Sequence, residues 1–127
     1  MAGFEHLVKS YDVGALLDDI ASADPPAYLR RCFAEGCSSA RLSWARVREL
    51  ALCAMVLDSI INDRDYGLEP ELIADWRLHY AHACSHMKDV AVSALRRAQE
   101  ISSPPDPDAA SELAELERRL APAREPA

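Results

Sequence analysis

The stretch LALCAMVLDSII, residues 50–61, decides the fold expected for this chain. At 100° per residue its large apolar side chains spread around most of the circumference of a helix, and a helix that is apolar on several sides is buried on several sides. We therefore expect a central helix from Trp44, capped by Ser43, to about Asn62 or as far as Tyr66. Inside it, Asp58 needs a specific partner, because burying an unpaired carboxylate is unfavourable.

A second long helix is expected from Pro70, where proline is typical of a first turn, to about Ile101. The next segment, SSPPDPD, ends it, because proline cannot extend a helix. Asp106 then starts a short final helix with one narrow apolar seam. The seam consists of Leu113, Leu116 and Leu120. It either folds back on its own bundle or packs on another chain.

The composition favours packed helices over a sheet, since half of the residues are apolar but only 6% are aromatic. We expect an all-α fold: a small bundle of four to five helices with two long antiparallel central helices and a short C-terminal helix after a Pro-rich linker. Among the shorter preceding helices, Gly36 should end the one that begins at Pro25. The expected organisation is a helical bundle domain over 1–101, a linker over 102–107, the final helix over 108–121 and a disordered tail over 122–127.

Charge and length exclude several classes of function. The net charge of −7 disfavours binding to nucleic acid or to anionic membranes, because both need clustered Lys and Arg. The longest mostly apolar run, residues 50–61, is too short to span a bilayer. We therefore predict a cytoplasmic protein without a membrane contact or a cofactor, in which the four cysteines are reduced thiols.

A row of polar side chains marks the second long helix. At 100° per residue these side chains share one side, opposite the face of Trp76, Tyr80 and Met87 that should point into the core. The row consists of Asp75, His79, His82, His86 and Asp89. We interpret it as a solvated helix face or as an interaction surface for a partner chain.

Metal binding is an alternative for the same row. Side chains three or four residues apart on a helix can touch, so the imidazoles of His79, His82 and His86 could hold a metal ion in pairs. Two ligands do not complete a site. The other ligands would come from another helix or from a second copy of the chain.

An enzymatic alternative rests on Arg77 and His82, whose RxxxxH spacing resembles the motif of HEPN-domain ribonucleases. The resemblance implies a compact all-helical dimer in which the two residues line a cleft between protomers and cleave RNA without a metal. It would assign catalysis to Arg77 and His82, with His79 as an accessory polar residue.

The function we expect is a non-enzymatic protein-interaction module, either an adaptor, a regulatory subunit or a small structural subunit, that self-associates as a homodimer or joins a larger complex. Two features motivate it. A helix of about 30 residues is about 45 Å long, more than the shorter helices would cover. The apolar run 50–61 also offers more than one apolar side. The interaction surface should comprise the polar row together with the leucine seam of the final helix.

Overall fold

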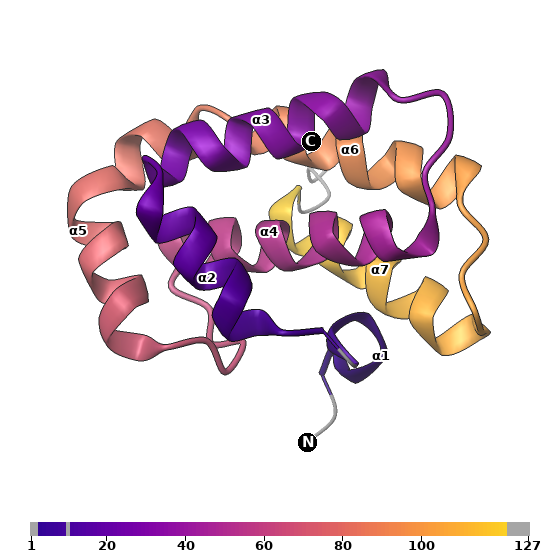
Figure 1. Ribbon diagram of the computed structural model, residues 1–127, viewed down its shortest axis with the longest axis horizontal. Helices are drawn as coiled ribbons and strands as arrows, with labels where there is room; N and C mark the ends of the chain where they lie inside the picture. The colour runs from indigo at the N-terminus through magenta and orange to yellow at the C-terminus, as the bar shows by residue number, and fades with distance from the viewer. Residues whose placement is uncertain (1–2, 10, 122–127) are drawn as a thin grey trace, which may run out of the picture.

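The computed structural model describes residues 3–9 and 11–121, and all regular secondary structure within these ranges is helical (Figure 1). The helices are α1 (Glu5–Val8), α2 (Val13–Ser22), α3 (Pro25–Ser38), α4 (Trp44–Asn62), α5 (Pro70–Ser85), α6 (Lys88–Ile101) and α7 (Pro107–Leu120). The predicted all-α class is confirmed. The described part of the chain holds seven helices instead of four to five, because α1 is a separate turn and the second long helix is divided.

α4 runs through the middle of the molecule (Figure 1). It begins as expected, with the Ser43 hydroxyl accepting a hydrogen bond from the backbone N–H of Arg46 at 3.2 Å. Every residue from 51 to 60 is buried, and α4 contacts α1, α3, α5, α6 and α7. The chain's own helices therefore cover all sides of the apolar run, and its composition no longer indicates a partner subunit.

The helix expected from Pro70 to Ile101 is broken near its midpoint, so this prediction was wrong. α5 ends at Ser85, and the N–H of Met87 donates to the carbonyl of Cys84 at 3.1 Å, as in a tight turn. Neither proline nor glycine occurs there. Packing explains the bend: α5 lies on α4 at one end of the molecule, whereas α6 turns to run along α3 (Figure 1). Both α5 and α6 are thereby buried on their apolar sides, and neither is too long for the bundle.

Gly36 lies inside α3 and does not end it, contrary to expectation. Its role is close packing. A Cβ atom at this position would lie 2.9 Å from Cδ1 of Leu50 and 3.3 Å from Cβ of Ala94. The glycine thus lets α3 approach α4 and α6 closely.

α7 folds back on the same bundle. Asp106 caps it as predicted, with its carboxylate accepting from the N–H of Ala109 at 2.8 Å. α7 contacts α1, α4 and α6, and Leu113, Leu116 and Leu120 are buried in the common core. The tail predicted over 122–127 lies outside the described residues. Among the described residues, no helix combines the length and the apolar character needed to cross a bilayer.

Candidate functional site

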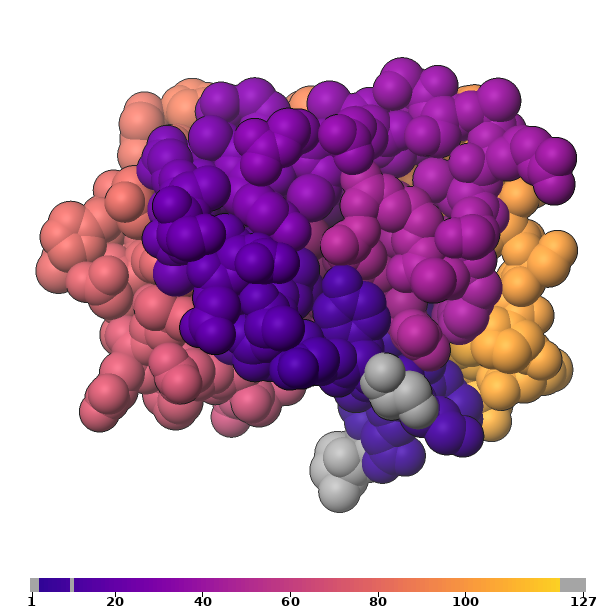
Figure 2. Space-filling view, viewed as in Figure 1, coloured from indigo at the N-terminus to yellow at the C-terminus, as the bar shows by residue number. Residues whose placement is uncertain are grey.

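The candidate site is the outward side of α5, at one end of the molecule (Figures 1 and 2). Five exposed side chains fall within about 80° of one another there, at 100° per residue. We call them the α5 face: Glu71, Asp75, Leu78, His82 and His86, the last of which directly follows the final residue of α5. Leu78, midway along the length of the face, is 80% exposed, by far the most exposed large apolar side chain among the described residues.

The three histidines of the predicted row are all exposed, as the angular pattern indicates. His82 and His86 are in contact: their Nε2 atoms lie 3.1 Å apart and their rings are perpendicular. His79 instead turns Nδ1 toward the carbonyl oxygen of Asp75, at 2.9 Å, and toward its carboxylate, at 3.3 Å. The structure therefore brings together one imidazole pair and one imidazole–carboxylate pair. Asp89, beyond the bend, is exposed on α6.

Arg77 and His82, the pair behind the ribonuclease alternative, make separate contacts. The guanidinium of Arg77 reaches the end of α4, where it donates to the carbonyl oxygen of Ser59 at 3.0 Å and to the carboxylate of Asp63 at 2.7 Å. The His82 ring points outward and contacts His86. The arginine therefore joins α5 to α4, and the two side chains do not converge on one point within the chain.

The leucine seam of α7 was expected to belong to the interaction surface. Leu113 is 1% exposed, and Leu116 and Leu120 have no exposed surface. The chain itself covers these three side chains, so the candidate surface is reduced to α5.

A buried polar group lies at the end of α4. Asp58 has no exposed side-chain surface and finds the partners expected of it: Nδ2 of Asn62 donates to it at 2.7 Å, the Tyr66 hydroxyl donates a short hydrogen bond, and Nε of Arg64 lies 3.2 Å away. Burial, followed by the bond to Asp58, raises the pKa of the Tyr66 phenol. The network ties the α4–α5 loop to α4. Beside it, Arg64 and Arg77 line a hollow of about 250 Å³.

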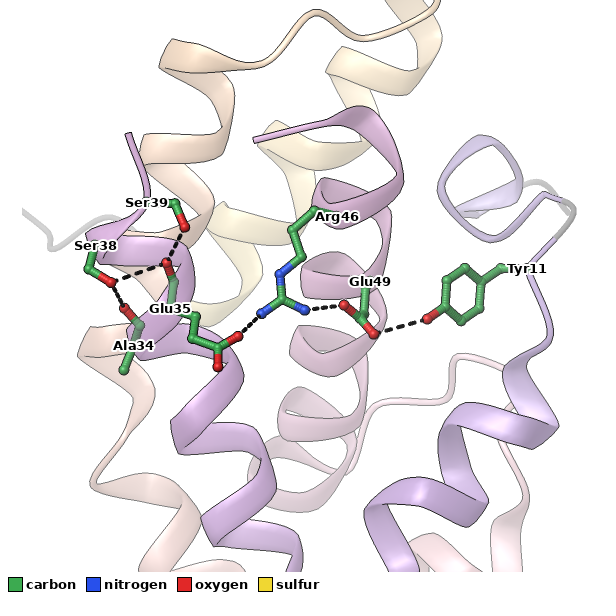
Figure 3. Close-up of polar contacts among 7 residues, drawn as sticks. All are labelled: Tyr11, Ala34, Glu35, Ser38, Ser39, Arg46 and Glu49. Atoms are coloured by element: carbon green, nitrogen blue, oxygen red, sulfur yellow. Dashed lines mark hydrogen bonds and ion pairs between the residues drawn. The ribbon is translucent and has the colours of Figure 1, made fainter. Parts of the chain in front are cut away.

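A second polar cluster joins α3, α4 and the segment before α2 (Figure 3). Arg46 donates to Glu35 at 2.5 Å and to Glu49, and Glu49 accepts from the Tyr11 hydroxyl at 3.3 Å. Burial and then the nearby Glu49 raise the pKa of Tyr11 to about 12. The acids are paired with Arg46, so the cluster serves as a clamp between elements and presents no free acid or base. Sequence spacing gave no signal for it, because Tyr11 and Glu49 lie far apart in the chain.

The third cluster joins the two ends of the described chain. Nδ1 of His6 lies 2.5 Å from Oε2 of Glu112, and Nε2 of the same His6 ring lies 3.8 Å from Oδ2 of Asp108. The hydrogen bond to Glu112, with the charges of Glu112, Asp106 and Asp108, raises the pKa of His6. No spacing in the sequence indicates this cluster, since more than a hundred residues separate His6 from Glu112.

Comparison with known proteins reveals no similarity to this chain. The chain matches no family model, no curated protein and no solved structure. The HEPN resemblance therefore rests on the spacing of Arg77 and His82 alone.

Proposed function

We propose that the protein is a non-enzymatic interaction module that binds a second copy of itself through the α5 face. The observation that carries the proposal is the position of Leu78. It is 80% exposed and lies between carboxylates on the N-terminal half of the face and imidazoles on the C-terminal half. An exposed leucine alone needs no explanation, but this one is flanked by a pattern of charge that complements itself.

In a two-fold symmetric dimer both copies use the same surface patch, so this patch must complement itself. If two α5 helices pair antiparallel about an axis next to Leu78, the two leucines meet at the centre. Asp75 of one copy then faces His82 of the other, and Glu71 faces His86. Each carboxylate then accepts a hydrogen bond from an imidazole of the other copy.

The expected contact is small. A helix of 16 residues is about 24 Å long, and one helix pair buries on the order of 1,000 Å², below the size of most stable interfaces. The association should therefore be weak and reversible. It suits a module whose state changes with concentration, and we place it in the cytoplasm, as its four free thiols favour.

Sedimentation velocity at increasing protein concentration tests the proposal. The wild-type mass should rise from monomer to dimer, and Leu78→Ser should shift this transition to higher concentration. Val90→Ser is the matched control, because Val90, on α6, is the other exposed large apolar side chain within residues 3–9 and 11–121. A monomer at every concentration contradicts the proposal, and so does a transition that Leu78→Ser leaves in place. If the protein forms a complex with a different protein but not with itself, the proposed partner, a second copy, is wrong.

Metal binding is a second candidate function for the same face, favoured by the 3.1 Å between Nε2 of His82 and Nε2 of His86. Two imidazoles bound to one tetrahedral Zn²⁺ place their nitrogens about 3.3 Å apart, given bonds of about 2.0 Å. The pair supplies two ligands, and the remaining ones would come from the second copy. Elemental analysis of protein purified without a histidine tag tests this function: a zinc content that is lower in His82→Gln than in the wild type supports it, and a zinc content that His82→Gln leaves unchanged, or wild-type protein free of metal, contradicts it.

A further inference from the structure

Three side chains of metal-ligand type meet where α1 approaches the start of α7. His6, Asp106 and Asp108 each present a ligand atom, and the three atoms lie within 4.8 Å of one another. The chain brings them together from positions about a hundred residues apart, through the packing of α1 on α7. This location is separate from the α5 face, so a site here does not depend on the self-association of that face.

Glu112 fixes the state of the His6 ring. Its side chain is 13% exposed and accepts from two backbone N–H groups, those of His6 at 3.0 Å and Leu7 at 3.2 Å. It also contacts Nδ1 of His6 at 2.5 Å. An ionised carboxylate only accepts hydrogen bonds, so Nδ1 carries a proton. In the neutral ring, the lone pair then lies on Nε2, the nitrogen 3.8 Å from the carboxylate of Asp108.

A lone pair and two carboxylates that face one another repel unless a positive charge lies between them. A proton on Nε2 supplies such a charge, and so does a metal ion. One imidazole nitrogen and two carboxylate oxygens are ligands that Zn²⁺ accepts, with water in the fourth position. A carboxylate on the other ring nitrogen is the usual support of a zinc-bound histidine, because it fixes the tautomer and makes the ligand more basic.

We propose that His6, Asp106 and Asp108 bind one Zn²⁺ ion, with Glu112 as the positioning residue of His6. The ion joins α1 to α7 and so connects the two ends of the described chain. Ligand atoms around zinc lie about 3.0–3.5 Å apart, so small side-chain rotations suffice to close the site. The bound ion stabilises the folded chain because the unfolded chain does not hold these three residues together.

Isothermal titration calorimetry with Zn²⁺ tests the site in a full-length background that carries His79→Gln, His82→Gln and His86→Gln. These exchanges remove the imidazoles of α5 as competing ligands. We expect one Zn²⁺ per chain and a higher melting temperature in its presence. Asp106→Asn with Asp108→Asn should weaken binding by at least about tenfold, and Glu112→Gln by about 10–100-fold.

The paired asparagine variant should fold normally, because asparagine caps a helix about as well as aspartate and Asp108 is mostly exposed. Asp18→Asn with Asp19→Asn is the matched control, since it removes two exposed carboxylates from α2, and it should leave zinc affinity unchanged. If the background protein binds no Zn²⁺, or if the Asp106/Asp108 variant binds it as tightly as the background, the proposed site is wrong.

Discussion

Asp58, buried inside α4, accepts a hydrogen bond from Nδ2 of Asn62 one turn further along the same helix, at 2.7 Å. With Tyr66 and Arg64 as further partners, the carboxylate holds the α4–α5 loop in place. Asp58→Ala removes the buried acceptor that is shared by the half-buried Tyr66 and the exposed Asn62 and Arg64. We expect the free energy of unfolding to fall by about 1–3 kcal/mol, measured by urea denaturation. Asp18→Ala, on the exposed side of α2, is the control and should change it little. An unchanged midpoint for Asp58→Ala would show that the network does not stabilise the fold.

A substitution of Gly36 tests whether α3 packs closely against α4 and α6. An alanine at this position favours the helix by up to about 1 kcal/mol, but its Cβ overlaps Leu50 and Ala94, and overpacking costs about 1–3 kcal/mol. We expect Gly36→Ala to destabilise the protein by about 1–2 kcal/mol in chemical denaturation. In Gly14→Ala the new Cβ meets only Asp12, at 3.5 Å, so this control should stabilise by about 0.5 kcal/mol. A stabilising Gly36→Ala would mean that the three helices have room to spare.

The contact between His6 and Glu112 predicts a pH dependence in metal-free protein containing EDTA. Glu112 raises the pKa of His6 above the ordinary value of 6.5. The stabilisation is therefore fully present below the unfolded pKa and is lost as pH rises through the raised folded pKa. The difference in unfolding free energy between wild type and His6→Gln should shrink from about pH 6 to about pH 8.5. A difference that is constant over this range contradicts a raised pKa.

Arg77 is predicted to act on stability and not on RNA. Its guanidinium joins α5 to Ser59 and Asp63 at the end of α4, so Arg77→Ala should lower the free energy of unfolding by about 1 kcal/mol. The control Arg41→Ala, at an exposed position, should leave the free energy of unfolding unchanged. Mixed RNA should stay intact with the wild-type protein. RNA cleavage by the wild type that both Arg77→Ala and His82→Ala abolish would instead support the HEPN-like ribonuclease.

Local signals in the sequence predicted the boundaries that depend on neighbouring residues. Ser43 and Asp106 cap helices where expected, and the apolar run of α4 is central and buried. The bend before Met87 could not be predicted, because the apolar period continues through it and only the packing of α5 on α4 and α6 on α3 decides it.

The candidate sites also include some features that neighbouring residues determine and others that only the tertiary packing determines. The exposure of the histidines on α5 follows from helical periodicity within one segment. The contact of His6 with Glu112 depends on the fold as a whole, and no spacing in the sequence predicts it. The burial of the α7 leucines settles an alternative that periodicity left open, since an apolar seam fits its own bundle and a second chain equally well.

The central claim, that two α5 faces pair antiparallel, is tested most directly by exchanging charges across the proposed contact. Asp75→Arg opposes the partner's His82, and His82→Asp opposes the partner's Asp75, so each change alone should weaken dimerisation in sedimentation velocity. The two changes together restore opposite charges and should restore the dimer. The matched control is Asp18→Arg on α2, which changes the net charge by the same amount as Asp75→Arg. This control should not affect dimerisation. Single variants that dimerise like the wild type, or a double variant that stays monomeric, would contradict the pairing.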